Sequence, residues 1–111
     1  MTAFFPPFIA ELPAPRGPFA IDAHIVPSAH VLTMFFEAHE DTDVPEHAHG
    51  PQWGVVLEGE MVLEIDGVSA TYRRGDTYYV PDQVPHRARL VAGYKGIDVF
   101  ADADRYEPVQ Q

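Results

Sequence analysis

The sequence predicts an all-β fold, an antiparallel barrel or jelly-roll sandwich formed by one domain. About eight short β-rich runs alternate with glycine, proline and aspartate turn signals at near-regular spacing, which is typical of this class. No run has the periodicity of an amphipathic helix. The length of 111 residues suits one domain, and 46% hydrophobic residues can fill a modest core.

Residues 1–18 are expected to form an extended arm, and residues 19–111 to form the barrel. Five of the eleven prolines fall in this first segment, a density that predicts extended chain and argues against a helix. The arm also carries Phe4, Phe5, Phe8 and Ile9, which are too apolar to remain in water. We therefore expect the arm to pack on the barrel or on a neighbouring subunit.

The predicted strands follow one another with short connections. They comprise residues 19–26, 30–38, 52–58, 61–66, 69–73, 77–80, 86–91 and 95–101. Between two of these runs, Asp66-Gly67 is a strong signal for a two-residue hairpin turn.

Two of the predicted strands are apolar on both faces. Leu32, Met34 and Phe36 share one face of their strand and Phe35 lies on the other, and residues 53–57 show the same pattern. One face can enter the core, so the other needs a second cover. Either the N-terminal arm covers it, or two copies of the chain bury the outer face of one sheet. We expect a homodimer, because so large an exposed apolar patch is unusual on a monomer.

The charge balance excludes several kinds of partner. Seven basic and seventeen acidic side chains give a formal charge of −10, which repels nucleic-acid phosphates and anionic lipids. The chain contains no cysteine, which excludes disulfides and thiolate metal ligands. The first residues show neither a basic leader nor a long apolar run, so we expect neither a signal peptide nor a membrane span, and a cytoplasmic location.

Three histidines and one glutamine stand in a pattern that favours a metal site. On a strand, His47 and His49 would point to the same face, and the glycine and proline after them can turn Gln52 back towards them. His86 falls on an inward face of a later predicted strand. An isolated His-x-His pair is more often two loop histidines, but the turn residues around both segments favour convergence. Three imidazoles and an amide oxygen suit a first-row divalent metal.

At these residues the chain resembles the cupin superfamily. Its first motif has two histidines one residue apart, usually a glutamate, and a later glycine; the matching residues here are His47, His49, Gln52 and Gly59. Its second motif has a glycine, five residues, a proline and then a histidine, matched by Gly75, Pro81 and His86. The resemblance implies a small double-stranded β-helix barrel. It also implies one divalent transition metal (iron, nickel, manganese or zinc) on His47, His49, Gln52 and His86.

Gln52 stands where most cupins have a glutamate. Neutral ligands would leave the full charge on the ion, making it a stronger Lewis acid that attracts anionic ligands. An amide oxygen is also a weaker donor, so the three histidines are expected to provide most of the metal affinity.

The remaining polar candidates have weaker support. Tyr78 and Tyr79 are adjacent, so one of them must face the barrel interior. Tyr79 and His24 are our candidates for residues that contact the metal ligands. Asp98, with Asp102 and Asp104, is expected at a solvated C-terminal edge. The sequence identifies no catalytic residue.

These observations favour a metal-dependent enzyme that acts on a small organic molecule inside the barrel. We slightly favour dioxygenase-like chemistry over Lewis-acid isomerase or lyase chemistry, because histidine-rich open sites suit redox metals. The alternative is a non-catalytic module that binds and senses a small molecule. A fold alone does not choose between these activities.

Overall fold

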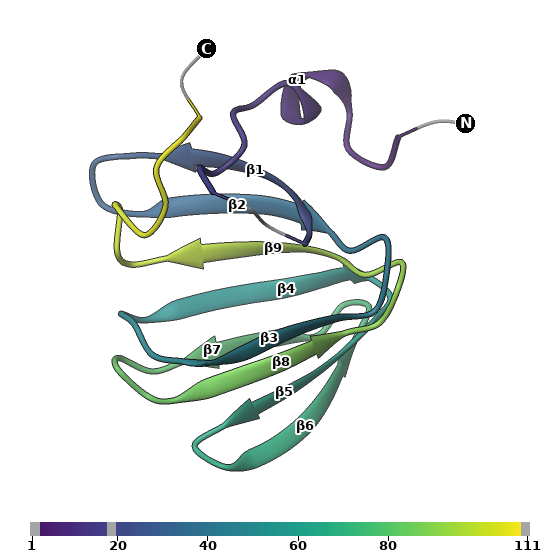
Figure 1. The fold of residues 1–111 in the computed structure, drawn as a ribbon, viewed down its shortest axis with the longest axis vertical. Coiled ribbons are helices and arrows are strands. Elements are labelled where there is room, and N and C mark those ends of the chain that lie inside the picture. The colour runs from purple at the N-terminus through teal and green to yellow at the C-terminus, as the bar shows by residue number, and fades with distance from the viewer. Residues whose placement is uncertain (1–2, 18–19, 110–111) are drawn as a thin grey trace.

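A computed structural model describes residues 3–17 and 20–109 of the chain. Two antiparallel sheets face each other and enclose the core (Figure 1). The strands are β1 (Asp22–Pro27), β2 (Leu32–Glu37), β3 (Thr42–His47), β4 (Gln52–Glu58), β5 (Glu60–Ile65), β6 (Val68–Arg73), β7 (Thr77–Val80), β8 (His86–Leu90) and β9 (Lys95–Phe100). One sheet has the order β1-β2-β9-β4-β7 and the other β3-β8-β5-β6. The predicted all-β jelly roll is confirmed.

The core lies between the two sheets and follows the alternation of the strands. Leu32, Met34 and Phe36 of β2 are buried, as are Met61 and Leu63 of β5 in the opposite sheet. The hairpin between β5 and β6 turns at Asp66 and Gly67, whose φ angles are 50° and 79°. Positive φ at both central residues is what a tight hairpin turn requires, so this prediction is confirmed.

The structure adds one strand that the sequence did not predict. β3 contains Asp43, Pro45 and Glu46, a composition that is typical of a loop. It pairs with β8, and its register shifts between Val44 and His47. Proline has no N–H to donate to a ladder, so Pro45 is accommodated within this irregularity.

The N-terminal segment differs from the extended arm we expected. Pro7–Ala10 forms a short helix, α1. Proline is well suited to the first position of a helix, where its missing N–H would lack an intrahelical partner in any case. Before the helix, Phe5 is buried and packs edge-to-face on Phe35 of β2, with ring centroids 5.8 Å apart. The predicted arm end at 18 and strand start at 19 lie outside the described residues.

The outer face of the five-stranded sheet carries apolar side chains. Trp53 of β4 is 45% exposed, Tyr79 of β7 57% and Val26 of β1 39%. Trp53 is paired with Tyr79 on one side and with Val99 of β9 on the other. Within the described part of the chain, no helix has the length and apolar character to cross a membrane.

Candidate metal centre

Strand pairing brings His47, His49 and His86 together. His47 ends β3 and is paired with His86, the first residue of β8, while His49 lies in the loop before β4. The ring centroids are 4.2 Å apart for His47 and His86, 4.8 Å for His49 and His86, and 5.1 Å for His47 and His49. One ring nitrogen from each lies within 4.8 Å of the others. His49 reaches the cluster from a loop and does not share a strand with His47.

Each of the three imidazoles is held by a backbone carbonyl close to it in sequence. Nδ1 of His47 lies 2.8 Å from the Pro45 carbonyl, Nδ1 of His49 2.7 Å from that of Gly50, and Nδ1 of His86 2.9 Å from that of Val84. A carbonyl can only accept, so each Nδ1 carries the proton and each Nε2 retains its lone pair. A backbone carbonyl commonly orients a metal-binding histidine in this way.

Two of the three free nitrogens are buried. Nε2 of His49 and Nε2 of His86 have no hydrogen-bond partner among the residues that the structure describes. A buried polar atom without a partner costs free energy and calls for a ligand or another explanation. Three converging lone pairs of neutral imidazoles fit a divalent transition metal.

Burial also favours the neutral form of His49 and His86. It lowers the pKa of His49 and the pKa of His86; hydrogen bonds to the backbone oppose the change, and the positive charge of Arg105 adds to it. A neutral imidazole is the form that binds metal, so protons compete less at this site than at an exposed histidine.

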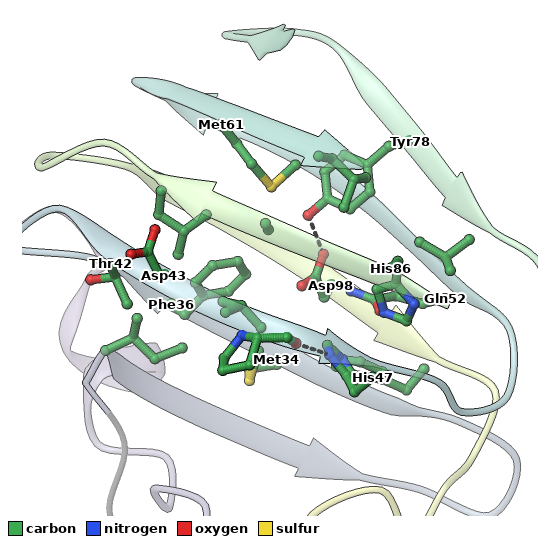
Figure 2. Close-up of a pocket in the computed structure, with 18 of the residues that line it drawn as sticks. Met34, Phe36, Thr42, Asp43, His47, Gln52, Met61, Tyr78, His86 and Asp98 are labelled. Carbon is green, nitrogen blue, oxygen red and sulfur yellow. Dashed lines mark hydrogen bonds between the residues drawn. The ribbon is translucent and has the colours of Figure 1, made fainter. Parts of the chain in front are cut away.

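Gln52, the fourth predicted ligand, lines the same cavity as His47 and His86, and Figure 2 shows all three at one end of it. Its side chain hydrogen-bonds Asp98 and lowers the pKa of that carboxyl. A group that lowers a carboxyl pKa by hydrogen bonding donates to the carboxylate, so the amide nitrogen of Gln52 faces Asp98. Its amide oxygen is then available to the centre.

Next to this centre is a cavity of about 250 Å³ between the two sheets. Its apolar wall includes Met34, Phe36, Met61, Leu90 and Phe100. The cavity therefore joins a polar end, formed by the imidazoles, to an apolar chamber that can hold a small organic molecule.

Two polar residues of the cavity wall were assigned incorrectly from the sequence. Tyr78 faces inward and is buried, whereas Tyr79, our candidate, is exposed. Asp98 is buried in the wall and not at a solvated edge, and it accepts a hydrogen bond from the Tyr78 hydroxyl. Burial raises the pKa of Asp98 to about 7, against the opposing hydrogen bonds from Tyr78 and Gln52. Burial, followed by the nearby charge of Asp98, raises the pKa of Tyr78.

His24 does not reach the cavity. Its Nδ1 lies 2.9 Å from the Leu12 carbonyl, and its Nε2 lies 3.4 Å from the Asp22 carboxylate.

Asp102, which was also expected at a solvated edge, supports the centre indirectly. Its carboxylate accepts a hydrogen bond of 2.8 Å from the backbone N–H of Gly50, next to His49. A period of two along β9 places Asp98 on the same face as Phe100, but Ile97 and Val99 make the other face apolar as well, so the sequence pattern alone does not place Asp98 inside.

Comparisons with known proteins agree with this architecture. The fold is similar to that of an RmlC-like cupin from Shewanella frigidimarina, with a TM-score of 0.78, 24% identity, and 94% and 95% of the two chains covered. It is also similar to a salicylate 1,2-dioxygenase from Pseudaminobacter salicylatoxidans, with a TM-score of 0.67 and 16% identity over 77% of this chain and 27% of that one.

A curated relative from Xanthomonas oryzae pv. oryzae, a 3-hydroxyanthranilate 3,4-dioxygenase, is 44% identical over 52 residues. The match covers 43% of this chain and only 30% of the relative. The family defined by the cupin domain matches residues 32–93, more than half of the chain. Together with the two-sheet barrel, this match shows that the chain belongs to the cupin family.

Proposed function

We propose that this cupin is a metal-dependent enzyme that oxidises a small organic molecule with dioxygen. The observation that carries the proposal is the set of three converging imidazoles, each with Nδ1 bonded to a carbonyl and Nε2 directed to a common centre. The dioxygenase names of relatives that match part of the chain favour oxygen chemistry over isomerase or lyase chemistry.

In this proposal one end of the cavity binds the metal and the other end binds the organic substrate. His47, His49 and His86 would hold a divalent iron, nickel or manganese ion, with the amide oxygen of Gln52 as a weaker donor. Such an ion would supply a Lewis-acid and one-electron redox centre at that end of the cavity. Met34, Met61 and Phe100 would hold the organic substrate next to it and exclude water.

Asp98 and Tyr78 are the polar groups placed to handle a substrate proton. The pKa of the Asp98 carboxyl is about 7, which is close to the value that suits a general base near neutral pH. Gln52 and Tyr78 fix its orientation through their hydrogen bonds. In this proposal Asp98 accepts a proton from a hydroxyl or amino group of the substrate.

The first test is elemental analysis of tag-free protein purified without chelator and without a nickel column. His49→Ala is measured beside it, and His30→Ala is the matched control, because His30 is exposed and lies outside the cluster. Near-stoichiometric metal in the wild type and in His30→Ala, with loss in His49→Ala, would support the centre.

The second test measures oxygen uptake by the iron-loaded protein with catechols, aminophenols and diols. Uptake that matches substrate loss one to one, and that disappears in His49→Ala, is the expected result. Stoichiometric zinc without oxygen uptake would contradict the dioxygenase proposal and favour Lewis-acid chemistry. A wild type that refuses every added metal would leave a cupin that binds its ligand without metal.

A further inference from the structure

Strand pairing does not position all three imidazoles of the metal centre equally. His47 ends β3 and His86 begins β8, and these two strands pair with each other. His49 lies in the connection of residues 48–51, between β3 and β4. A loop moves more than a paired strand unless other contacts hold it. The position of His49 therefore depends on contacts made by the connection itself.

Gly50 joins the His49 imidazole to the C-terminal segment, residues 101–109. The carbonyl of Gly50 accepts a hydrogen bond of 2.7 Å from Nδ1 of His49. The N–H of Gly50 donates one of 2.8 Å to Oδ2 of Asp102. A hydrogen bond to a carboxylate is stronger than one to a neutral acceptor. Two hydrogen bonds thus connect the Asp102 carboxylate, through one residue, to the ring that would hold the metal.

The contact between Gly50 and Asp102 is close. Gly50 is buried, and a Cβ atom added to it would collide with the Asp102 carboxylate. The carboxylate therefore lies directly against the backbone of Gly50, nearer than a residue with a side chain would allow. This close fit restrains the connection at the residue that follows His49.

The C-terminal segment is anchored on both sides of Asp102. Before it, the N–H of Ala101 donates a hydrogen bond of 2.9 Å to the carbonyl of Pro51. After it, the carbonyl of Glu107 accepts a hydrogen bond of 2.6 Å from the N–H of Arg16, in the N-terminal part of the chain. The segment can therefore hold the connection in place instead of moving with it.

We propose that Asp102 is a positioning residue of the metal centre: it orients His49 through Gly50 and thereby raises the affinity for a divalent transition metal. This inference rests on the proposed function, because it concerns the same metal centre. It also extends the centre beyond residues 32–93, the part of the chain that matches the cupin domain, since Asp102 lies outside that match.

The contribution of Asp102 should be partial. The N–H of Gln83 also donates a hydrogen bond of 2.7 Å to the carbonyl of His49, so the connection keeps some order without the carboxylate. Loss of a residue that orients a metal ligand commonly lowers metal affinity about ten- to a hundredfold. We expect a loss of this size in the zinc affinity of Asp102→Ala, with the barrel still folded.

The test measures zinc affinity of the full chain by competition with a coloured chelator. Asp104→Ala is the matched control, because it removes the same charge from an exposed position two residues away. It should stay within about threefold of the wild type, since an exposed charge contributes little. Asp102→Asn removes the charge but keeps an acceptor oxygen for Gly50, so it should also stay within about threefold.

A spectroscopic measurement separates orientation of the ligand from a general loss of stability. The visible spectrum of the cobalt(II)-saturated protein reports the number and arrangement of the ligands. This spectrum should change in Asp102→Ala and remain that of the wild type in Asp104→Ala and Asp102→Asn. Urea unfolding of each metal-free variant, monitored beside it, shows that the barrel is folded at the start of the titration.

A second substitution tests the route through Gly50. Gly50→Ala should displace the Asp102 carboxylate and lower zinc affinity as far as Asp102→Ala does. Gly50→Ala combined with Asp102→Ala should bind zinc no more weakly than either single variant, because both changes break one and the same contact.

Several outcomes would overturn the inference. Wild-type zinc affinity in Asp102→Ala would do so, and an equal loss in Asp102→Asn would show that the charge matters and the hydrogen bond does not. Additive losses in the double variant would exclude the route through Gly50. A wild type that binds no metal would contradict both proposals. The expected losses without oxygen uptake by the iron-loaded protein would contradict only the dioxygenase proposal, and oxygen uptake with unchanged affinity in Asp102→Ala would contradict only this inference.

Discussion

The hydroxyl of Tyr78 on β7 donates to the carboxyl of Asp98 on β9, although another strand separates β7 from β9 in the sheet. Gly54 of β4 lies between them and is paired with both residues in register. A side chain at Gly54 would collide with the Tyr78 ring and with the Asp98 carboxyl. The missing side chain is therefore what lets the tyrosine ring cross β4 and reach the carboxyl.

This arrangement predicts that Gly54→Ala is strongly destabilising. The added methyl group has no free space, because both neighbours are buried and bonded to each other. We expect a loss of about 3 kcal/mol in the free energy of unfolding, measured by urea denaturation. Gly54→Ala combined with Tyr78→Leu should recover part of that loss, since the shorter side chain no longer crosses β4. A double variant as unstable as the sum of its parts would contradict the steric explanation.

We expect the metal ligands to be unequal. His86→Ala should abolish metal binding, because it removes a buried imidazole whose Nε2 has no other partner among the described residues. Gln52→Ala should weaken metal binding about ten- to a hundredfold without abolishing it, since an amide oxygen is the weaker donor. Competition titration with a coloured chelator measures both variants. Equal losses in the two variants would contradict this ranking.

Asp98 should produce a pH-dependent difference in stability between the metal-free wild type and Asp98→Asn. The pKa of Asp98 is raised from 3.8 to about 7 in the folded protein, so between these values the folded state holds a proton that the unfolded state releases. The stability from this protonated carboxyl is complete below about pH 4 and is lost as the pH rises through 7.

Asparagine mimics the protonated form at every pH. The stability of Asp98→Asn relative to the wild type should therefore increase from pH 5 to pH 8, by on the order of 2 kcal/mol in the free energy of unfolding. The lowered pKa values of His49 and His86 act in the opposite direction, but they are common to both proteins and cancel in the difference. A difference that stays constant with pH would show that Asp98 titrates in its usual range.

The exposed apolar face around Trp53 leads us to expect a homodimer. Sedimentation velocity should give about twice the chain mass of 12.4 kDa for the wild type. Trp53→Arg should shift the protein to the monomer, because it buries a charge in the expected interface. Thr71→Arg, on exposed β6 of the other sheet, is the matched control. A wild type that sediments as a monomer would contradict the expectation.

The fold was predictable where local signals were strong. Asp66-Gly67 marks its hairpin, and the alternation of β2 gives the buried face correctly. β3 was missed because Pro45 and the acidic residues around it resemble a loop. Its strand conformation depends on pairing with β8, which is far away in the sequence.

The candidate site, too, was predictable only where local signals were strong. The spacing of His47 and His49 and the turn residues before His86 identified the three imidazoles as a group. Asp98 was missed because β9 is apolar on both faces, with Ile97 and Val99 alternating against Phe100, so the pattern does not show which face is buried. The link from Tyr78 to Asp98 depends on the order of three strands, which no local pattern encodes.

The carbonyl bonds at Pro45, Gly50 and Val84 fix the three imidazoles within the folded chain itself. A metal bound there would meet preformed ligands, in contrast to small zinc domains that fold only when metal arrives. Chelation should then empty the site without unfolding the barrel, and a different ion could enter the same ligands. The metal that this protein carries would be decided by the supply of ions at the time of loading and not by the folding of the chain.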